Sequence, residues 1–199
     1  MADHYFTKQP NAKSRPKTWD AVLKGRRFRF TSDEGVFAKH GIDPGTEWLI
    51  EAFEMPGADG SILDVGCGYG PIGICLAKQY PERRIVMVDI NERAVALAVT
   101  NAKANDAGNV LVMQSDLFAD VPAEPFAAIV SNPPIRAGKN VVYCLFESAY
   151  DRLVDGGELW IVIRKQQGAA SALKKLQSVF RETSVIFKKK GYVVIKAVK

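Results

Sequence analysis

Two short motifs contain residues that could hold a ligand and act on it. The segment Asp64 to Gly70 (DVGCGYG) follows an apolar pair, and Asn132-Pro133-Pro134 comes later in the chain. Glycines let the backbone approach a ligand closely and adopt positive φ, and a helix that starts after them would offer free N–H groups to a carboxylate or phosphate. Together the motifs predict an enzyme that holds a nucleoside-bearing cofactor beside a flat substrate with an amine.

Asn132-Pro133-Pro134 has the composition of a stiff turn that presents hydrogen-bond acceptors. The Asn132 carboxamide oxygen and the Pro133 carbonyl could accept from an exocyclic amine and free its lone pair from an aromatic ring. Proline fixes φ and restrains the residue before it. Holding the amine in line with a sulfonium methyl could supply most of the catalysis. The alternative interpretation is an ordinary Pro-Pro loop.

Two acids follow later predicted strands and could complete a nucleoside site. Asp89 lies nineteen residues after Gly70, and its carboxylate could accept both hydroxyls of a ribose. Asp116-Leu117 could flank an adenine ring. The glycines also match the dinucleotide fingerprint, which would suit a dehydrogenase. Asp64 counts against that alternative, because an acid before the first glycine suits a zwitterionic amino-acid tail better than a pyrophosphate.

The elements that must position these residues alternate along the chain. Apolar runs predict strands, and amphipathic stripes bounded by Pro and Gly predict helices. Strands are expected at 27–31, 61–65, 84–89, 110–114, 126–130, 158–164, 184–188 and 192–197, and helices at 44–53, 71–79, 92–105, 141–153 and 169–180. This order predicts an α/β fold with a doubly wound, mostly parallel, seven-stranded sheet that ends in a C-terminal antiparallel hairpin. Ligands of such sheets bind beyond the carboxyl ends of the strands.

The net charge of +5 conceals a strong segregation of charge. Residues 1–29 hold eight Lys or Arg against two acids, and residues 164–199 hold ten against one, whereas the stretch between holds nine against nineteen. Basic ends and arginines interleaved with aromatics in Arg26 to Phe30 favour a nucleic-acid partner; solvated surface lysines are the alternative. We expect a basic flexible arm at 1–27 and one domain at 28–199.

Other classes of protein are disfavoured by composition. No run of about 18 apolar residues is present, so no membrane span is expected, and the polar N-terminus has no signal-peptide core. Three cysteines without a CxxC pair and two histidines predict neither a disulfide framework nor a metal site. We therefore expect a cytoplasmic protein without a metal.

These motifs make the chain similar to class I S-adenosylmethionine-dependent methyltransferases, which have a Rossmann-like fold. Within that class it most resembles the bacterial 16S rRNA guanine-N2 methyltransferases of the small-subunit methyltransferase C type, through Phe30 to Phe37, Asp64 to Gly73 and Ser131 to Lys139. The resemblance implies S-adenosylmethionine as cofactor and methylation of a guanine amine. It implies cofactor contacts from Phe37, Asp64, Gly66, Cys67, Gly68, Gly70, Asp89, Ile90, Asp116, Leu117 and Asn132, and catalysis by Asn132, Pro133, Pro134 and Ile135.

Two departures from that family bear on the substrate. Many amino-group methyltransferases have an aromatic residue after the Pro-Pro pair to stack on the target, and here the residue is Ile135. The best-known relatives also carry a second, N-terminal domain. RNA binding is therefore expected to rely on the basic arm (Arg26, Arg27, Arg29), on the C-terminal lysines (Lys188 to Lys190) or on self-association, with Arg136 and Lys139 reaching phosphates. A solvated hairpin is the alternative interpretation of Lys188 to Lys190. The expected partner is ribosomal RNA or the small ribosomal subunit, bound by a monomer or a homodimer.

Three other functions fit parts of the same pattern. The Asn-Pro-Pro turn also serves adenine amines in DNA or tRNA and a glutamine amide in proteins. A nucleotide-dependent dehydrogenase would use the glycines and Asp89 without the turn. A non-catalytic RNA-binding module that kept the fold would not need an intact Asn132-Pro133-Pro134.

Overall fold

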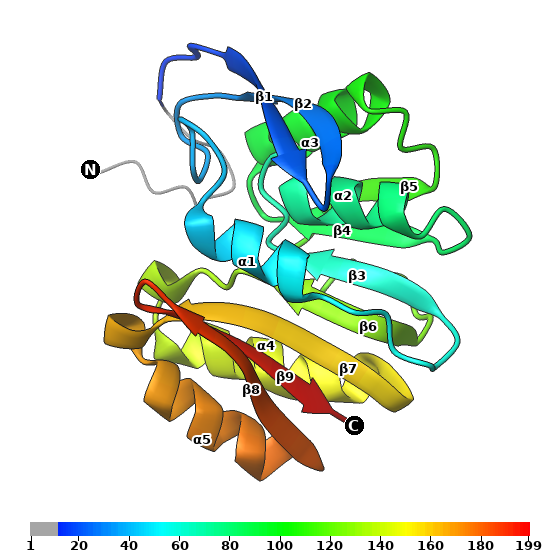
Figure 1. The fold of residues 1–199 in the computed structure, drawn as a ribbon, viewed down its shortest axis with the longest axis vertical. Coiled ribbons are helices and arrows are strands. Elements are labelled where there is room, and N and C mark those ends of the chain that lie inside the picture. Colours follow the sequence, from blue (N-terminus) through cyan, green and yellow to red (C-terminus); the bar gives the residue numbers. More distant parts are fainter. Residues whose placement is uncertain (1–11) are drawn as a thin grey trace.

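A seven-stranded sheet forms the centre of the computed structural model, which describes residues 12–199. Its strand order is β5-β4-β3-β6-β7-β9-β8, with β3 to β7 parallel and β9 antiparallel to both of its neighbours (Figure 1). The strands are β3 (Ser61–Val65), β4 (Ile85–Asp89), β5 (Val110–Gln114), β6 (Phe126–Ser131), β7 (Leu153–Arg164), β8 (Glu182–Lys189) and β9 (Tyr192–Val198). The predicted fold class is confirmed.

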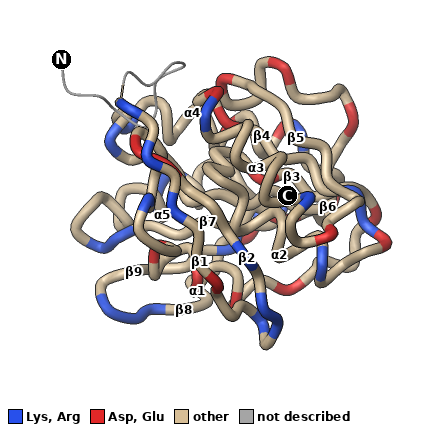
Figure 2. The backbone as a smooth tube through the Cα atoms, turned by 90° about the horizontal axis from the view of Figure 1, so that it is seen from above, with Lys and Arg blue, Asp and Glu red and all other residues tan. Residues whose placement is uncertain are grey.

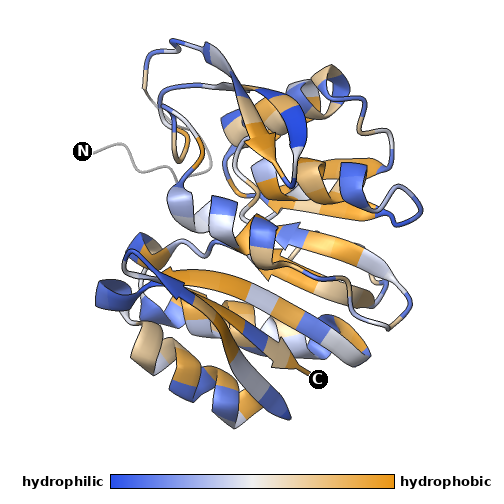
Figure 3. Ribbon diagram, in the orientation of Figure 1, coloured by the Kyte–Doolittle hydropathy of each residue, from blue (hydrophilic) through white to orange (hydrophobic). Residues whose placement is uncertain are grey.

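Helices cover both faces of this sheet. One apolar core contains residues of α1 (Pro44–Ala52), α2 (Pro71–Gln79) and α3 (Glu92–Ala104). The other contains residues of α4 (Lys139–Arg152) and α5 (Ala169–Val179). Strands buried on both faces need apolar side chains on both, and Figure 3 shows the middle strands coloured as hydrophobic along most of their length. Two single 3₁₀ turns, η1 (Ile135–Ala137) and η2 (Lys165–Gln167), lie just after β6 and β7.

The predicted boundaries differ from the structure mainly around α4 and β7. The helix begins at Lys139 rather than residue 141, and β7 begins at Leu153 rather than residue 158. Leu153 is buried and pairs with Phe126, and the register then shifts before Ala128 pairs with Glu158. The glycines at 156 and 157, which predicted a helix end, instead lie inside this irregular stretch of strand.

The prediction of a flexible arm over residues 1–27 is wrong for its last part. β1 (Lys17–Leu23) and β2 (Arg26–Ser32) form an antiparallel hairpin, so a boundary after residue 27 cuts through β2. The turn is two residues long, with φ of 45° at Lys24 and 73° at Gly25, as tight hairpins require. β1 packs on the core through the alternate residues Trp19, Ala21 and Leu23. Residues 1–11 of the arm lie outside the described part.

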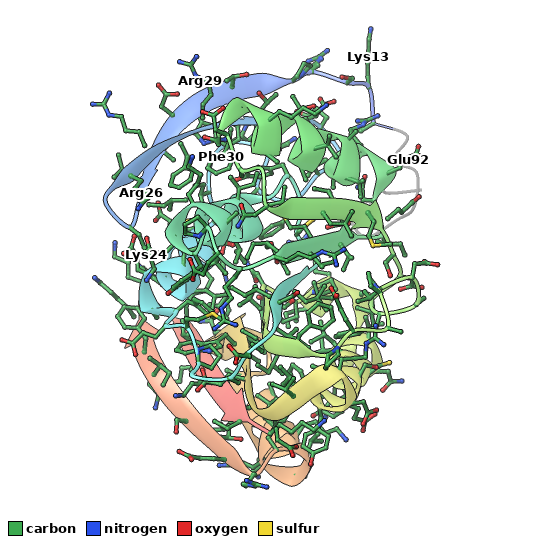
Figure 4. The ribbon with its side chains drawn as sticks, turned by 90° about the vertical axis from the view of Figure 1, so that its right-hand side faces the viewer. Lys13, Lys24, Arg26, Arg29, Phe30 and Glu92 are labelled. Atoms are coloured by element: carbon green, nitrogen blue, oxygen red, sulfur yellow. The ribbon has the colours of Figure 1, made fainter. Side chains whose placement is uncertain are left out.

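Two asparagines, Asn101 on α3 and Asn105 at its C-terminal cap, hold this hairpin against the domain. Asn101 accepts from the Thr31 N–H and donates to the Thr31 carbonyl, and Asn105 does the same at Arg29, with N···O distances of 2.8–2.9 Å. Residues four apart on a helix are neighbours on its surface, and their spacing matches alternate residues of a strand. Figure 4 shows Arg26 and Arg29 on this hairpin, at the edge of the molecule. No helix within residues 12–199 is long and apolar enough to cross a membrane.

Candidate active site

The two motifs converge on one cleft of about 850 Å³ at the carboxyl ends of the parallel strands. These strand ends lie on the left of Figure 1. This size suits a small-molecule or cofactor site. Many of the predicted site residues line it: Phe37, Gly66, Gly68, Asp89, Ile90, Asp116, Leu117, Asn132, Pro133, Pro134, Ile135 and Arg136. The remaining predicted residues are not part of its lining: Asp64, Cys67, Gly70, Lys139, Arg26, Arg27 and Arg29.

Gly66 and Gly68 keep the floor of the cleft open. Both have positive φ, at 73° and 57°, and a Cβ built on either would meet no atom within 4 Å. The Gly66 and Cys67 N–H groups donate to the Val88 carbonyl, which fixes the turn between β3 and α2. The Cys67 side chain is buried, and burial raises the pKa of its thiol. Cys67 is therefore not a thiolate nucleophile at neutral pH.

Gly70 and Asp64 support the glycine turn from beneath and are not part of the cleft lining. Gly70 has φ of 98°, and a Cβ there would lie 2.7 Å from Ile74 Cδ1. Asp64 is fully buried, and its Oδ2 accepts from the Gly73 N–H at 2.9 Å. Burial raises the pKa of Asp64 to about 7, the Gly73 hydrogen bond opposes this rise, and the nearby Asp89 carboxylate adds to it. Asp64 Oδ1 has no hydrogen-bond partner within residues 12–199.

Asp89 presents its carboxylate to the cleft in a fixed orientation. Its Oδ2 accepts from the Gly68 N–H at 2.8 Å, and its Oδ1 accepts from the Asn91 N–H at 2.9 Å. Burial raises the pKa of this carboxyl, while these backbone hydrogen bonds lower it. A carboxylate oxygen can accept more than one hydrogen bond, so each oxygen can still accept a hydroxyl. Asp116 and Leu117 lie beyond β5 on the same side of the cleft.

Asn132 faces the cleft with its carboxamide oriented by α1. Its Nδ2 donates to Thr46 Oγ1 at 3.0 Å and to Asp43 Oδ2 at 3.4 Å. Since the amide N–H groups are engaged there, Oδ1 is left as the acceptor for a ligand. The neighbouring Pro133 carbonyl accepts from the Ile135 N–H at 2.8 Å across Pro134, whose φ of −75° and ψ of 75° form an inverse γ-turn. That carbonyl retains a second lone pair.

The residues that hold Asn132 from behind were not predicted from the sequence. Asp43 caps α1, with Oδ2 accepting from the Gly45 and Thr46 N–H groups. Its Oδ1 accepts from the Tyr192 hydroxyl at 2.9 Å, which in turn accepts from Arg164 Nη2 at 2.5 Å. Asp43 before Pro44 is a helix-start signal that the sequence offered. Arg164 and Tyr192 could be found only from the pairing of β7 with β9.

The segment 35–43, which lines one side of the cleft, is tied to each of the sequence motifs. Its Gly35 carbonyl accepts from Asn91 Nδ2 at 2.9 Å, next to Asp89. Its Gly41 carbonyl accepts from the Tyr69 hydroxyl at 3.1 Å, within the glycine turn. At its end, Asp43 meets Asn132. Phe37 is carried on this segment, 37% exposed and lining the cleft.

The basic residues predicted to bind RNA are divided between two places. Arg136 lines the cleft, and Lys139 is exposed at the start of α4. Arg26 Nη1 donates to the Lys78 carbonyl at 2.8 Å, and Arg29 pairs with Asp20 at 3.0 Å, both on the β1–β2 hairpin away from the cleft lining. No group of three or more His, Cys, Asp or Glu side chains among the described residues is placed to hold a metal ion.

Comparisons with known proteins identify the family to which this chain belongs. The model of the methyltransferase small domain matches residues 27–196. "Uncharacterized protein YbxB" of Bacillus subtilis (strain 168) is 53% identical over 200 residues, covering all of both chains. Ribosomal RNA small subunit methyltransferase C of Pasteurella multocida is 39% identical over 142 residues, covering 68% of this chain and 42% of that one.

More distant relatives point to the same fold. Ribosomal RNA large subunit methyltransferase G of Streptomyces avermitilis is 28% identical over 208 residues, covering 98% of this chain and 53% of that one. The structure of the Thermus thermophilus 16S rRNA N2 G1207 methyltransferase, in complex with AdoMet and guanosine, superposes with a TM-score of 0.83 at 26% identity, covering 96% of this chain and 52% of that chain. The chain thus spans about half the length of the ribosomal RNA methyltransferases it matches. These matches favour the methyltransferase alternative over a dehydrogenase, and the chain belongs to the methyltransferase small domain family.

Proposed function

We propose that this protein transfers a methyl group from S-adenosylmethionine to the exocyclic amine of a guanine in small-subunit ribosomal RNA. One observation carries the proposal: Asp89, suited to a ribose, and the oriented Asn132 carboxamide, suited to an amine, share one cleft. The names of the relatives support an RNA substrate, and small-subunit and large-subunit enzymes both occur among them.

The residues on one side of the cleft fit the cofactor. The open space above Gly66 and Gly68 admits a ligand close to the backbone, and the acids Asp89 and Asp116 suit a molecule with cationic groups. Asp89 would accept the ribose hydroxyls, with Ile90, Asp116 and Leu117 beside the adenine and Phe37 closing the opposite side. S-adenosylmethionine supplies an electrophilic methyl group on its sulfonium.

The residues on the other side would orient the nucleophile. Asn132 Oδ1 and the Pro133 carbonyl would each accept one N–H of the guanine amine, which directs the nitrogen lone pair out of the ring plane. Ile135 would contact the base, and Val141 and Val162 are further apolar residues of the cleft lining. Positioning of this kind can account for a large part of a rate enhancement.

The target base must leave its helix or loop to reach this cleft. We propose that Arg136 and Lys139 contact phosphates next to the flipped nucleotide, and that Arg26, Arg27 and Arg29 contact more distant RNA. Arg26 and Arg29 would exchange their present intramolecular partners for phosphate, so we expect each of them to contribute less than a cation without a partner.

A transfer assay with methyl-labelled S-adenosylmethionine tests this proposal. Purified protein is incubated separately with small-subunit RNA, large-subunit RNA, tRNA, DNA and a protein fraction, all from cells that lack the enzyme. We expect label in small-subunit RNA, recovered as N2-methylguanosine after nuclease digestion. Label only in large-subunit RNA, in adenine or in a glutamine side chain would replace the proposed substrate with that one.

A further inference from the structure

We propose that a basic corner formed by Arg164, Lys165 and Lys188 to Lys190 is the main RNA-docking surface of this protein. This inference rests on the proposed RNA substrate, and it assigns the surface that holds the phosphate backbone of that RNA. The corner combines the end of β7 with the turn between β8 and β9. It appears in Figure 2 as a blue segment at the β8–β9 turn, separate from the basic residues of the β1–β2 hairpin.

The corner is a direct continuation of the cleft wall. Arg164 and Tyr192 line the cleft and pair with each other across β7 and β9. Tyr192 also pairs with Lys189 across the turn, and the Lys165 N–H donates to the Gly191 carbonyl at 2.7 Å. A nucleotide whose base enters beside Asn132 would therefore have its flanking phosphates next to this turn.

The charges at the strand ends of the cleft are divided along the order of the strands. Asp89 and Asp116 lie at the ends of β4 and β5, whereas Arg136 and Arg164 lie after β6 and at the end of β7. Asp43 is the acid on the Asn132 side, and it is engaged by the Tyr192 hydroxyl and by Arg164 at 3.9 Å. The β8–β9 turn extends the basic side further in the same direction. One end of the cleft thus suits a cationic cofactor and the other a polyanion, so phosphates are attracted to the end that holds the Asn132 side of the site.

The four lysines of the corner are not neutralised by the described part of the protein, whereas Arg164 pairs with Asp43 Oδ1 at 3.9 Å. Lys165, Lys188, Lys189 and Lys190 are all exposed, and none of them forms an ion pair with an acid within residues 12–199. Elsewhere such pairs are common, as between Lys175 and Glu147. A cluster of unpaired cations beside a binding cleft favours an anionic partner.

The backbone of the turn gives a second, independent indication. Lys190 and Gly191 have φ of 47° and 81°, which is a two-residue hairpin turn in which Asn or Gly is favoured at the first position. Lys24 occupies the equivalent position in the β1–β2 hairpin, where its Nζ donates to the Phe53 carbonyl at 2.9 Å. Among residues 12–199 the Lys190 side chain makes no such hydrogen bond, so it is available to a partner outside the protein.

A binding experiment with matched charge variants tests this surface. The probe is a fluorescein-labelled single-stranded RNA fragment of the small subunit, titrated by anisotropy from 50 to 300 mM KCl. K188Q/K189Q/K190N removes three charges at the corner, and K103Q/K174Q/R181Q removes three charges outside the corner and the cleft lining. With a slope of about −0.7 per phosphate contact, we expect the salt dependence of the corner variant to flatten by about 2, and that of the control to change little.

A single substitution separates docking from folding. Lys190→Asn suits the turn, so thermal stability should be equal or higher, yet we expect affinity for the RNA probe to fall several-fold. In the methyl-transfer assay, the corner variant should have a raised KM for RNA. Its kcat at saturating RNA and its affinity for S-adenosylhomocysteine should both equal those of the wild type. Equal losses of affinity in both triple variants, or an unchanged salt slope at the corner, would overturn the inference. Corner-dependent RNA binding without methyl transfer to any RNA would instead contradict the proposed function alone.

Discussion

Asn132 Nδ2 lies 3.0 Å from Thr46 Oγ1, so the first turn of α1 determines which face of the carboxamide is presented to the cleft. Asp43 Oδ2 accepts from the same amide nitrogen at 3.4 Å and also caps the helix. If the amide rotated by half a turn, its N–H groups would point at the substrate amine instead of its acceptor oxygen. The hydroxyl of Thr46 and the carboxylate of Asp43 therefore act as positioning groups for the proposed reaction.

Replacing Thr46 with valine removes the hydroxyl while keeping the shape of the side chain. We expect kcat for methyl transfer to fall about tenfold, corresponding to ~1.4 kcal/mol, because both amide orientations become accessible. Thr46→Ser restores an acceptor and should restore most of the activity. Steady-state kinetics of the two variants, with calorimetric titration of S-adenosylhomocysteine as a control, make the comparison. Equal activity of the valine and serine variants would remove Thr46 from this role.

Removing the Asp43 carboxylate should cost stability as well as activity. Asp43→Ala deletes the cap of α1, a change of about 1 kcal/mol, and leaves the Tyr192 hydroxyl without its acceptor. Asp43→Ser keeps a capping oxygen but lacks the second oxygen that reaches Tyr192. We expect urea unfolding to show a clear loss of stability for the alanine variant and a smaller loss for serine, with reduced kcat in both. Full activity of the serine variant would mean that capping is the only role of Asp43.

Two glycines of the same motif should respond differently to replacement by alanine: Gly70→Ala should mainly reduce stability, and Gly66→Ala should mainly reduce ligand affinity. At Gly70 the added Cβ would lie within 3 Å of Ile74 and Met87, at a φ of 98°, so we expect ~2 kcal/mol or more of destabilisation. At Gly66 the Cβ would enter open space, so the main cost is that of a positive φ, about 1 kcal/mol. Thermal unfolding measures the loss of stability in each variant, and calorimetry measures the loss of affinity for S-adenosylhomocysteine. We expect the ratio of affinity loss to stability loss to be larger for Gly66→Ala than for Gly70→Ala. The reverse pattern would place Gly70, not Gly66, at the ligand.

The buried Asp64 should make the stability of the protein depend on pH. Its pKa is raised from 3.8 to about 7 in the fold, so between these values the folded protein keeps a proton that the unfolded chain releases. Stability contributed by this group therefore falls as pH rises toward 7 and is constant above it. Urea unfolding from pH 5 to 8 should show this fall in the wild type and a weaker one in Asp64→Asn. Identical pH profiles would show that Asp64 is already ionised in the folded protein.

The residues at the strand ends were predictable from sequence. Gly66, Asp89 and Asn132 each come at the end of an apolar run, so each was expected at the carboxyl end of a parallel strand. Asp64, by contrast, was predicted to contact the cofactor and is buried behind the turn, since one strand position decides whether a side chain faces the ligand or the core. The pairing of Arg164 with Tyr192 could not be predicted, because it depends on the register between the antiparallel strands β7 and β9. No local sequence pattern reveals that register. β1 was missed because it directly follows a segment rich in Lys, Pro, Asn and Ser, which predicted a flexible arm.

The central claim is that one cleft holds a methyl donor on its Asp89 side and a guanine amine at Asn132. Its most direct test is the rate of methyl transfer to small-subunit RNA by Asn132→Ala, measured beside the affinity of the same protein for S-adenosylhomocysteine. We predict a loss of transfer of at least about 100-fold, as for the removal of a key positioned group, with the affinity unchanged within about twofold. Methyl transfer at a rate near that of the wild type would contradict the account.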